Sequence, residues 1–467
     1  MKLRRIMIAA PKSGSGKTTV TCALLQLLKE QGQQVFSYKC GPDYIDPMFH
    51  KTVLQIPSKN LDTFFTDPET TRRLFLKGRD SHDMAVLEGV MGLFDGLGGI
   101  REEGSSYHLA QVTKTPIILV IDGKGMGRSL AALIRGFMEY DKDHLIKGVI
   151  LNRMSKSYFS ILKPVIEDEL GIAVLGYLPD NAALHVKSRH LGLQKPDELP
   201  EIQETLKAAA TELEKTLDME RLMAIADGAE ELEAVNAGAA ADSCGNGKAA
   251  CTHMDRPVIA VAHDEAFCFY YEDNLRMLEE CGAELRYFSP IHDTHLPKEC
   301  SGLLLGGGYP ELYAAKLSSN NSMMESIKTA MQNGLPTVAE CGGFMYLHTA
   351  IEDQNGTEYG MVGFLPGRCA YTGKLVRFGY IELEENSVHF LKSGERIRAH
   401  EFHYFDSTDN GDGCTARKPV TGRTYPCVVT GETYWLGFPH LYYPSNPDFA
   451  ERFVSMARAH ELHKNIM

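Results

Sequence analysis

The sequence lacks the paired cysteines that a disulfide framework or a zinc site would require. Its 11 cysteines include no C-x-x-C pair and follow no regular spacing. Cys244, Cys251 and His253 form one cluster of metal-ligand types, but a fourth ligand is missing and the segment is polar and rich in glycine and alanine. We therefore expect free thiols in a reducing cytoplasm and no zinc.

Long apolar runs and net positive charge are also absent. No stretch approaches the roughly 18 apolar residues of a membrane span, and the apolar run after the basic start Met1–Arg5 is too short for a signal peptide. The formal net charge of −13 argues against nucleic acid as a partner, although a local basic pocket could bind a small anion. With 467 residues, 43% apolar and 23% charged, the chain has the composition of a soluble protein with two or three domains.

The strongest motif in the chain is a phosphate-binding loop. The apolar run Ile6–Ala10 predicts a buried strand and Thr18–Glu30 predicts a helix, with small residues and Gly-Lys-Thr between them. In that context, backbone N–H groups and the helix N-terminus surround a phosphate. Lys17 would reach the terminal phosphates, and Thr18 would help to hold Mg²⁺. Pro11 replaces the usual first glycine of the loop. Lys12 occupies the place where MinD-like ATPases keep a second lysine. The expected nucleotide-binding residues are Lys12, Gly14, Gly16, Lys17, Thr18 and Thr19.

Acidic side chains follow two further predicted strands, Gln34–Lys39 and Met84–Leu87. An acid at the end of the second strand stands where a phosphate-binding-loop protein needs one near Mg²⁺. Each acid alone could instead cap a turn. Together, behind a phosphate-binding loop, we interpret them as functional. The polar residues of these loops are Asp43, Tyr44, Asp46, Glu88 and Asp95.

Strands alternate with helices through about Pro179, which predicts a parallel, doubly wound α/β domain. Asn152 and Arg153 end one of its strands, a pairing often near an adenine in this class of fold. His185, Arg189 and His190 lie in a loop, where they could bind an anionic substrate or be solvated. A second α/β domain begins near Pro257. The expected boundaries are 1–195 for the first domain, 196–255 for a helical segment and polar linker, 256–450 for the second domain and 451–467 for a C-terminal helix.

The second domain contains a cysteine at a sharp turn from a predicted strand to a predicted helix. Cys341 is followed by Gly342 and Gly343, and the glycine loop Gly306–Gly308 lies upstream. This pattern is typical of a nucleophile elbow, in which backbone N–H groups at the helix start stabilise a thiolate and an oxyanion. A cysteine nucleophile needs a histidine base. The candidates are His389, His400, His403 and His440.

Together, these motifs resemble the cobyrinate a,c-diamide synthase family of glutamine-dependent corrinoid amidases. The order and spacing agree over residues 1 to about 450. The resemblance implies an N-terminal P-loop domain and a C-terminal class I glutamine amidotransferase domain. The N-terminal domain would be akin to dethiobiotin synthetase, and in this family it would bind ATP and the corrinoid. The segments that carry the resemblance are the phosphate-binding loop, Gly41–Pro47, Glu88–Gly96, Gly306–Glu311 and Glu340–Gly343.

The resemblance also implies a reaction. ATP and L-glutamine would be consumed to convert the a and c acetate carboxylates of cobyrinate to amides through acyl phosphates, giving cobyrinate a,c-diamide, glutamate, ADP and phosphate. Ammonia would then travel by a shielded route between the domains. The implied roles are catalysis for Cys341 and His440; the oxyanion and glutamine pocket for Gly307, Gly308 and Gly342; Mg²⁺ binding for Thr18 and Glu88; corrinoid recognition for Asp43, Tyr44 and Ile45; and support of the phosphoryl step for Asp95.

One position departs from the pattern of the class. Many class I amidotransferases carry His-x-Glu, but Tyr442 stands where that glutamate would be. The adjacency of Glu340 to Cys341 does not justify adding this acid to the site, so the third catalytic member stays open.

Several alternatives also stay open. The acceptor could be hydrogenobyrinate, which lacks cobalt, or Ni-sirohydrochlorin, because any metal belongs to the ring and the sequence does not distinguish these rings. An enzyme of the cobyric acid synthase type, which amidates other side chains, is a more distant alternative, because its P-loop region usually reads differently. A MinD- or ParA-like switch ATPase is a remote alternative, because a switch has no use for the fused Cys341 domain. The sequence does not define the oligomeric state, and a homodimer is an open alternative.

Overall fold

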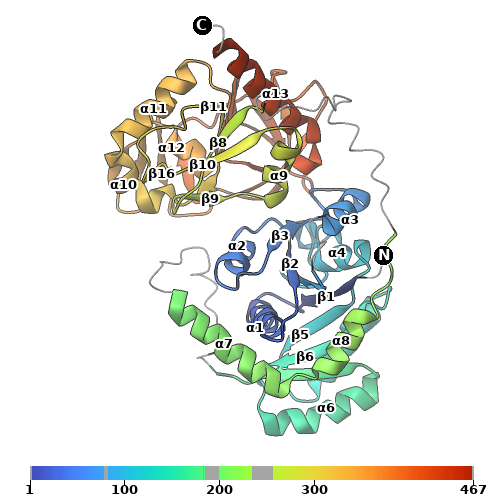
Figure 1. The fold of residues 1–467 in the computed structure, drawn as a ribbon. Helices are drawn as coiled ribbons and strands as arrows, with labels where there is room; N and C mark the ends of the chain where they lie inside the picture. Colours follow the sequence, from blue (N-terminus) through green and yellow to red (C-terminus); the bar gives the residue numbers. More distant parts are fainter. Residues whose placement is uncertain (1–2, 78–81, 182–183, 185–198, 234–255, 465–467) are drawn as a thin grey trace. The chain divides into compact units, whose positions relative to one another are not determined.

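The computed structural model describes residues 3–77, 82–181, 184, 199–233 and 256–464 (Figure 1). The chain divides into two compact units between Val235 and Asn236, and both are α/β. Two predictions fall outside the described residues and are not tested by this structure: the choice between anion binding and solvation for His185, Arg189 and His190, and the absence of zinc from Cys244, Cys251 and His253.

The first unit is organised around a parallel sheet. Its strands are almost fully buried and consist mainly of apolar residues, as expected for a sheet covered on both faces. β4 and β5 flank β1 on opposite sides, and Ile8 pairs in register with Glu88. The carboxyl ends of β1 and β4 therefore lie next to each other. In the described residues the order is β3 (Ser58–Leu61), β2 (Val35–Cys40), β4 (Met84–Glu88), β1 (Arg4–Ala9), β5 (Ile117–Asp122), β6 (Ile146–Asn152) and β7 (Ala173–Leu178).

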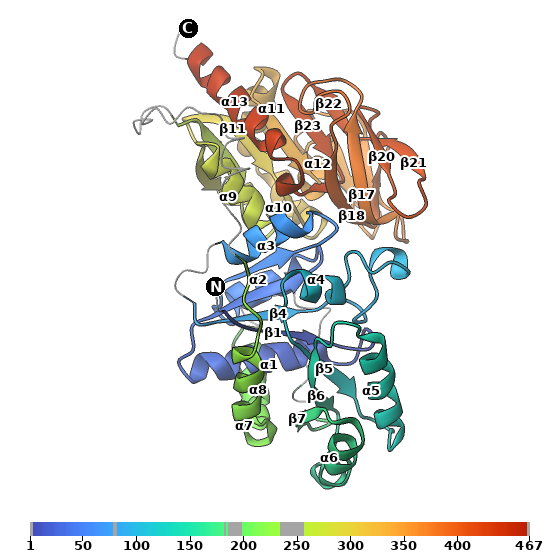
Figure 2. The same ribbon diagram turned by 90° about the vertical axis from the view of Figure 1, so that its right-hand side faces the viewer.

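Helices cover both faces of this sheet (Figures 1 and 2). On one face, α7 packs along α1 and against β7, and α8 contacts β1. Leu24 and Leu28 of α1 share a buried apolar cluster with Leu206 and Leu213 of α7. The helical segment after the sheet therefore completes the core of the first unit. The helices are α1 (Lys17–Glu30), α2 (Ile45–Thr52), α3 (Pro68–Leu76), the 3₁₀ turn η1 (Leu97–Gly99), α4 (Ser106–Val112), α5 (Ser129–Tyr140), α6 (Lys156–Leu170), α7 (Leu199–Thr216) and α8 (Met219–Asp227).

The second unit has a central sheet that is parallel except at one edge, where β22 runs antiparallel to β23. The C-terminal helix α13 packs against β11 and α9. Among the described residues, the order is β10 (Glu284–Phe288), β8 (Val258–Ala262), β11 (Cys300–Leu305), β13 (Thr337–Glu340), β23 (Tyr434–Gly437) and β22 (Val429–Gly431). Its helices are α9 (Glu272–Glu280), α10 (Ala314–Ser319), α11 (Asn321–Gln332), α12 (Gly342–Tyr346) and α13 (Pro447–Lys464), with 3₁₀ turns η5 (Pro310–Tyr313) and η6 (Tyr443–Ser445).

The second unit also contains smaller sheets, and Figure 2 shows the strands β17, β18, β20 and β21 of one of them beside each other. β24, which follows the central strand β23 in the chain, pairs with β18 of an antiparallel sheet. This pairing sets His440 opposite His400. That sheet has the order β21 (Thr424–Cys427), β20 (Cys414–Arg417), β17 (Arg377–Glu385), β18 (Ile397–His403) and β24 (His440–Leu441). The others are β15 (Glu358–Gly360), β14 (Ala350–Glu352), β16 (Arg368–Tyr371) and β19 (Phe405–Ser407), and the pair β12 (Gly307–Gly308) and β9 (Phe267–Phe269).

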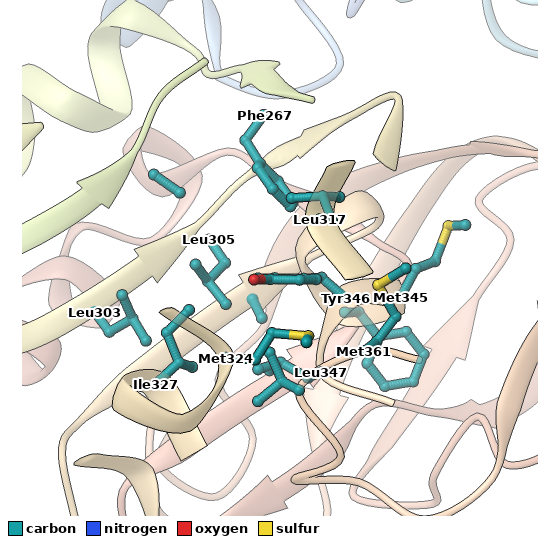
Figure 3. Packing of buried hydrophobic residues seen from close by; sticks show 14 of the residues in the cluster. Phe267, Leu303, Leu305, Leu317, Met324, Ile327, Met345, Tyr346, Leu347 and Met361 are labelled. Carbon is teal, nitrogen blue, oxygen red and sulfur yellow. The ribbon is translucent and has the colours of Figure 1, made fainter. Parts of the chain in front are cut away.

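An apolar cluster supports the short helix α12 (Figure 3). Met345 and Tyr346 of α12 pack with Leu305 of β11 and Met324 of α11, and Cys341 belongs to the same cluster. Each fully buried side chain of this size contributes roughly 1.5–3 kcal/mol relative to an exposed one. The turn that carries Cys341 is therefore held on a rigid base.

Candidate active sites

A cavity of about 500 Å³ lies at the carboxyl ends of β1 and β4 in the first unit. Of the residues predicted to bind a nucleotide, five line it, together with Asp43. Lys12 is exposed and, among the described residues, is not part of the lining. The five are Gly14, Gly16, Lys17, Thr18 and Thr19.

The end of β6 holds the backbone of the phosphate-binding loop. Asn152 donates a hydrogen bond from Nδ2 to the Ser15 carbonyl at 3.0 Å, and Arg153 donates one to the Gly14 carbonyl at 3.0 Å. Arg153 also pairs with Asp122. Gly16 has φ of 93°, and a Cβ there would overlap the Asn152 amide. Position 16 therefore requires glycine on both backbone and steric grounds.

A buried charge network forms the floor of the cavity. Thr18 Oγ1 donates to Glu88 Oε1 at 2.7 Å, and Lys39 Nζ donates to the same oxygen at 3.1 Å. Lys39 also forms an ion pair with Asp46. Burial raises the pKa of Glu88, and Lys39 opposes that shift. Burial would lower the pKa of Lys39, but Asp46 and Glu88 outweigh burial and raise it.

The sequence reasoning did not select Lys39. The available signal was a lysine within a strand that is buried throughout, Val35–Cys40, because a buried ammonium needs an anionic partner. In the structure Lys39 lines the cavity beside Lys17. Lys17 donates to the Met91 carbonyl, and burial together with the Lys39 charge lowers the pKa of Lys17 to about 8.

The loop after β4 approaches the phosphate-binding loop through Gly92. A Cβ on Gly92 would stand 2.7 Å from the Pro11 carbonyl oxygen. Asp95 is half-buried, and its carboxylate accepts a hydrogen bond from the Gly92 N–H at 3.0 Å. Among the described residues, Asp95 does not line the cavity, so in this structure it shapes the loop.

The three residues predicted to recognise a corrinoid have different surroundings. Asp43 lines the cavity, and its carboxylate accepts a hydrogen bond from the Ile45 N–H at 2.9 Å, as in a capped turn. Burial, followed by the Asp46 charge, raises the pKa of Asp43. Tyr44 is buried, and Ile45 packs against the apolar cluster beneath α1.

Cys341 occupies a strained turn in the second unit. Its φ and ψ are 45° and −101°, an unusual backbone conformation for a residue with a side chain. Its N–H donates to the Gly437 carbonyl at 2.8 Å, which ties the turn to β23. A Cβ on Gly343 would overlap the Leu305 carbonyl, so the helix start lies directly against β11. This arrangement has the strand, turn and helix of a nucleophile elbow.

The predicted glycine pocket closes around the same turn. A Cβ on Gly342 would lie 3.2 Å from the Gly308 backbone nitrogen. A Cβ on Gly307 would overlap Cε1 of the His440 ring, and Gly308 has φ of 152°. Close approach of backbone to backbone is what glycine permits. The structure therefore brings Gly307, Gly308 and Gly342 together beside Cys341 and His440.

Of the four candidate histidines, His440 is the one beside Cys341. Its side chain hydrogen-bonds to Cys341, and Nδ1 lies 3.8 Å from Glu340 Oε2. Burial opposes the imidazolium, but the charges on Cys341 and Glu340 outweigh burial and raise the pKa of His440 to about 10. The thiol and the imidazole thus lie side by side, the arrangement that a cysteine nucleophile and its base require.

The other histidines have structural surroundings. His403 stacks on Phe438 with ring centroids 4.0 Å apart, and its Nδ1–H donates to the Phe405 carbonyl at 2.6 Å. Burial lowers the pKa of His400 to about 3, with the His440 charge acting in the same direction. His389 is half-buried next to Glu385.

Other features bear on metals and membranes. Within residues 3–77, 82–181, 184, 199–233 and 256–464, no group of three or more His, Cys, Asp and Glu side chains is placed to hold a metal ion. The described helices include none with the length and apolar character needed to cross a membrane. The nine described cysteines are free thiols.

Two family models match the chain. Residues 6–193 match the CobQ/CobB/MinD/ParA nucleotide-binding domain, and residues 258–425 match the CobB/CobQ-like glutamine amidotransferase domain. This combination defines the class, a nucleotide-binding domain fused to a glutamine amidotransferase domain in a ligase.

Three relatives are similar over most of their length, and each is named cobyrinate a,c-diamide synthase. The one from Dehalococcoides mccartyi strain CBDB1 is 38% identical over 98% of this chain and 99% of its own. The one from Caldanaerobacter subterraneus subsp. tengcongensis is 38% identical over 97% and 98%. The one from Listeria innocua serovar 6a is 42% identical over 87% and 88%. The chain belongs to the cobyrinate a,c-diamide synthase family, whose members are glutamine-dependent ligases.

Proposed function

We propose that the protein uses ATP and glutamine to convert the a and c acetate carboxylates of cobyrinate to amides. The observation that carries the proposal is the presence, in one chain of this family, of a Cys341–His440 elbow and a P-loop cavity lined by Lys17 and Thr18. The first site can release ammonia and the second can activate a carboxylate. The products are cobyrinate a,c-diamide, glutamate, ADP and phosphate.

In the glutamine half, the Cys341 sulfur attacks the side-chain amide carbon of glutamine. Backbone N–H groups around Gly308 and Gly342 stabilise the negative oxygen of the tetrahedral intermediate. His440 gives its proton to the leaving nitrogen, and ammonia departs. Water then hydrolyses the glutamyl thioester, which releases glutamate and restores the thiol.

In the synthetase half, a substrate carboxylate oxygen attacks the γ-phosphorus of ATP and ADP leaves. Lys17 and the N–H groups of the loop stabilise the charge on the transferred phosphoryl group. Ammonia then attacks the acyl phosphate, inorganic phosphate leaves and the amide forms. Because free ammonia is largely protonated at neutral pH, we propose that it travels by a shielded route.

The residues at the cavity floor fit Mg²⁺. The Thr18 hydroxyl and the Glu88 carboxylate are oxygen ligands of the kind that this hard cation prefers. Glu88 Oε2 is buried and has no hydrogen-bond partner in the part of the chain that the structure describes. When bound, Mg²⁺ would neutralise phosphate charge. Thr18 and Glu88 are the proposed ligands.

Substrate recognition falls to the loop after β2. We propose that Asp43, Tyr44 and Ile45 bind or discriminate the corrinoid, because Asp43 lines the nucleotide cavity and the other two fix its loop. Asp95 supports the phosphoryl step by holding the loop that contacts Lys17.

The free thiols favour a reducing cytoplasm as the compartment.

The direct test is to incubate the purified protein with cobyrinic acid, MgATP and glutamine and to identify the corrinoid by mass spectrometry. A product that carries two amides at the a and c positions is the expected result. Unchanged cobyrinate together with hydrolysed glutamine would overturn the proposed acceptor, and the same assay with hydrogenobyrinate and Ni-sirohydrochlorin would then identify the ring.

A further inference from the structure

We propose that Glu340 is the positioning residue of His440 and supplies the carboxylate that many class I amidotransferases place two residues after the histidine. This inference rests on the proposed glutamine reaction, because it assigns a role within the same site. It starts from the residue before the nucleophile, which sequence adjacency alone did not connect to the histidine.

The fold brings the two side chains together from different strands. Glu340 ends β13 and pairs in register with Gly437 at the end of β23. The chain then needs only Phe438 and Pro439 to reach His440 in β24. As a result, Nδ1 of His440 lies 3.8 Å from Oε2 of Glu340, while the same ring hydrogen-bonds to Cys341. The imidazole therefore lies between a thiol and a carboxylate.

Burial strengthens this ion pair. Glu340 is 5% exposed and His440 is 3% exposed, so little water screens the two charges. Burial raises the pKa of Glu340, and both His440 and the Leu441 N–H oppose that shift because they favour the carboxylate. The ionised Glu340 carboxylate and the His440 imidazolium therefore stabilise each other.

Other titratable groups also face the pair. Burial lowers the pKa of His400 to about 3, so this ring is neutral at physiological pH. Burial holds the pKa values of Tyr270 and Tyr443 well above the usual range, so both phenols are neutral. Among these groups and Cys341, Glu340 is the one carboxylate that can stabilise the imidazolium.

Tyr442, at the usual position of the acid, is engaged elsewhere. Its hydroxyl donates to Asp273 at 3.0 Å, and its ring contacts Tyr271 edge to face with centroids 5.3 Å apart. Both partners lie at the start of α9. Tyr442 therefore anchors a helix, and the acid beside the catalytic histidine comes from position 340.

The size of the expected effect follows from the separation. At 3.8 Å the two atoms form an ion pair that is longer than a hydrogen bond. Removing the charge should therefore lower glutaminase kcat by roughly 10- to 100-fold, less than the ~10⁴-fold loss of a directly hydrogen-bonded triad acid.

The test is Glu340→Gln in the full chain, assayed with all substrates. We expect the glutamine-driven rate to fall by that factor while ammonia-driven amidation is unchanged. In the wild type, His440 loses its proton as pH rises through about 10. Without the neighbouring charge, the alkaline limb of glutaminase kcat/KM should move to lower pH, and Glu340→Asp should restore part of the shift.

Two controls separate positioning from folding. Glu385→Gln removes another buried acid, whose carboxylate accepts from the Phe390 and Leu391 N–H groups at 2.8 and 2.6 Å, and it should leave the alkaline limb in place. Tyr442→Phe should also leave the alkaline limb of glutaminase kcat/KM in place. An unshifted limb in Glu340→Gln would overturn the role of Glu340. If Glu340→Gln does not fold, the limb of Glu340→Asp decides the question. A wild-type protein without glutaminase activity would instead overturn the proposed function.

Discussion

Each unit buries a carboxylate next to its candidate site, but the surroundings of the two acids differ. Glu88 accepts hydrogen bonds from Thr18 at 2.7 Å and from Lys39 at 3.1 Å, and Asp46 shares the same lysine. Glu340 faces His440 at 3.8 Å. The first acid belongs to a network of fixed charges, whereas the second has a partner whose charge depends on the nearby cysteine.

Because of this difference, we expect substitutions near Glu88 to change mainly the stability of the protein and substitutions near Glu340 to change mainly its activity. A buried network that loses one charge leaves the others without compensation, so changes near Glu88 should destabilise the first unit. A titratable pair that loses one charge keeps its fold but reacts more slowly, so changes near Glu340 should affect turnover and its pH dependence. The following variants test that separation, beginning with the largest expected effect.

Cys341→Ala should disable one unit and leave the other intact. It removes the proposed nucleophile, so glutamine-driven amidation should fall by at least about 10⁴-fold. The P-loop cavity belongs to the first unit, so amidation with added ammonia should continue at the wild-type rate. Both rates can be measured from corrinoid product. Loss of the ammonia-driven rate as well would show that the two sites are not separable.

Gly16→Ala should produce the opposite pattern. A Cβ would overlap the Asn152 amide that holds Ser15, at a φ of 93°. We expect ATP-dependent amidation to fall about 10³-fold with either nitrogen source, since the loop can no longer surround phosphates. Alkylation of Cys341 by iodoacetamide should be unchanged.

Gly32→Ala is the matched control for this substitution. Gly32 has φ of 78°, but a Cβ there would meet no atom within 4 Å. It should cost about 1 kcal/mol of stability through backbone strain and leave amidation intact. Equal losses of activity in both variants would mean that strain, and not the contact with Asn152, causes the effect.

Lys39→Met should lower the free energy of unfolding by about 3–5 kcal/mol, because it leaves Asp46 and Glu88 buried without their cation. Urea titration measures the change. Lys147→Met makes the same substitution at an exposed position of the same sheet and should change stability by less than about 0.5 kcal/mol. If Glu340→Gln destabilised the protein as much as Lys39→Met, the contrast between network and pair would be wrong.

The parts of the sites that could be predicted from the sequence are those that lie within one segment. The strand, glycine-rich turn and helix around Lys17 are contiguous, and so are the strand and turn around Cys341, so local pattern was sufficient to indicate both folds. The pairing of β1 with β4 then brings Glu88 beside Thr18 because parallel strands end at one edge of a sheet. Both α/β units agree with the predicted fold class.

The parts that the sequence could not supply depend on packing between distant strands. The relation of Glu340 to His440 requires the register of β13 with β23, which no local pattern encodes. Lys39 was not recognised because its partners come from other segments. Likewise, Ile45 begins α2 and packs on the core, although the segment around it reads as polar.

Gly307→Ala should give the smallest loss of activity and tests whether the glutamine site depends on the placement of the imidazole. The added methyl would overlap Cε1 of His440, a ring that is 3% exposed and has little room to move. A small displacement should lower glutamine-driven amidation by about 10- to 100-fold, because catalytic geometry tolerates less than 1 Å of error. Ammonia-driven amidation should not change. Gly360→Ala is the control, since the nearest atom to a Cβ there is Ser318 Oγ at 3.9 Å. A Gly307→Ala enzyme that retained full glutamine-driven activity would show that the imidazole can shift without loss, and the positioning role of Glu340 would then lose its physical basis as well.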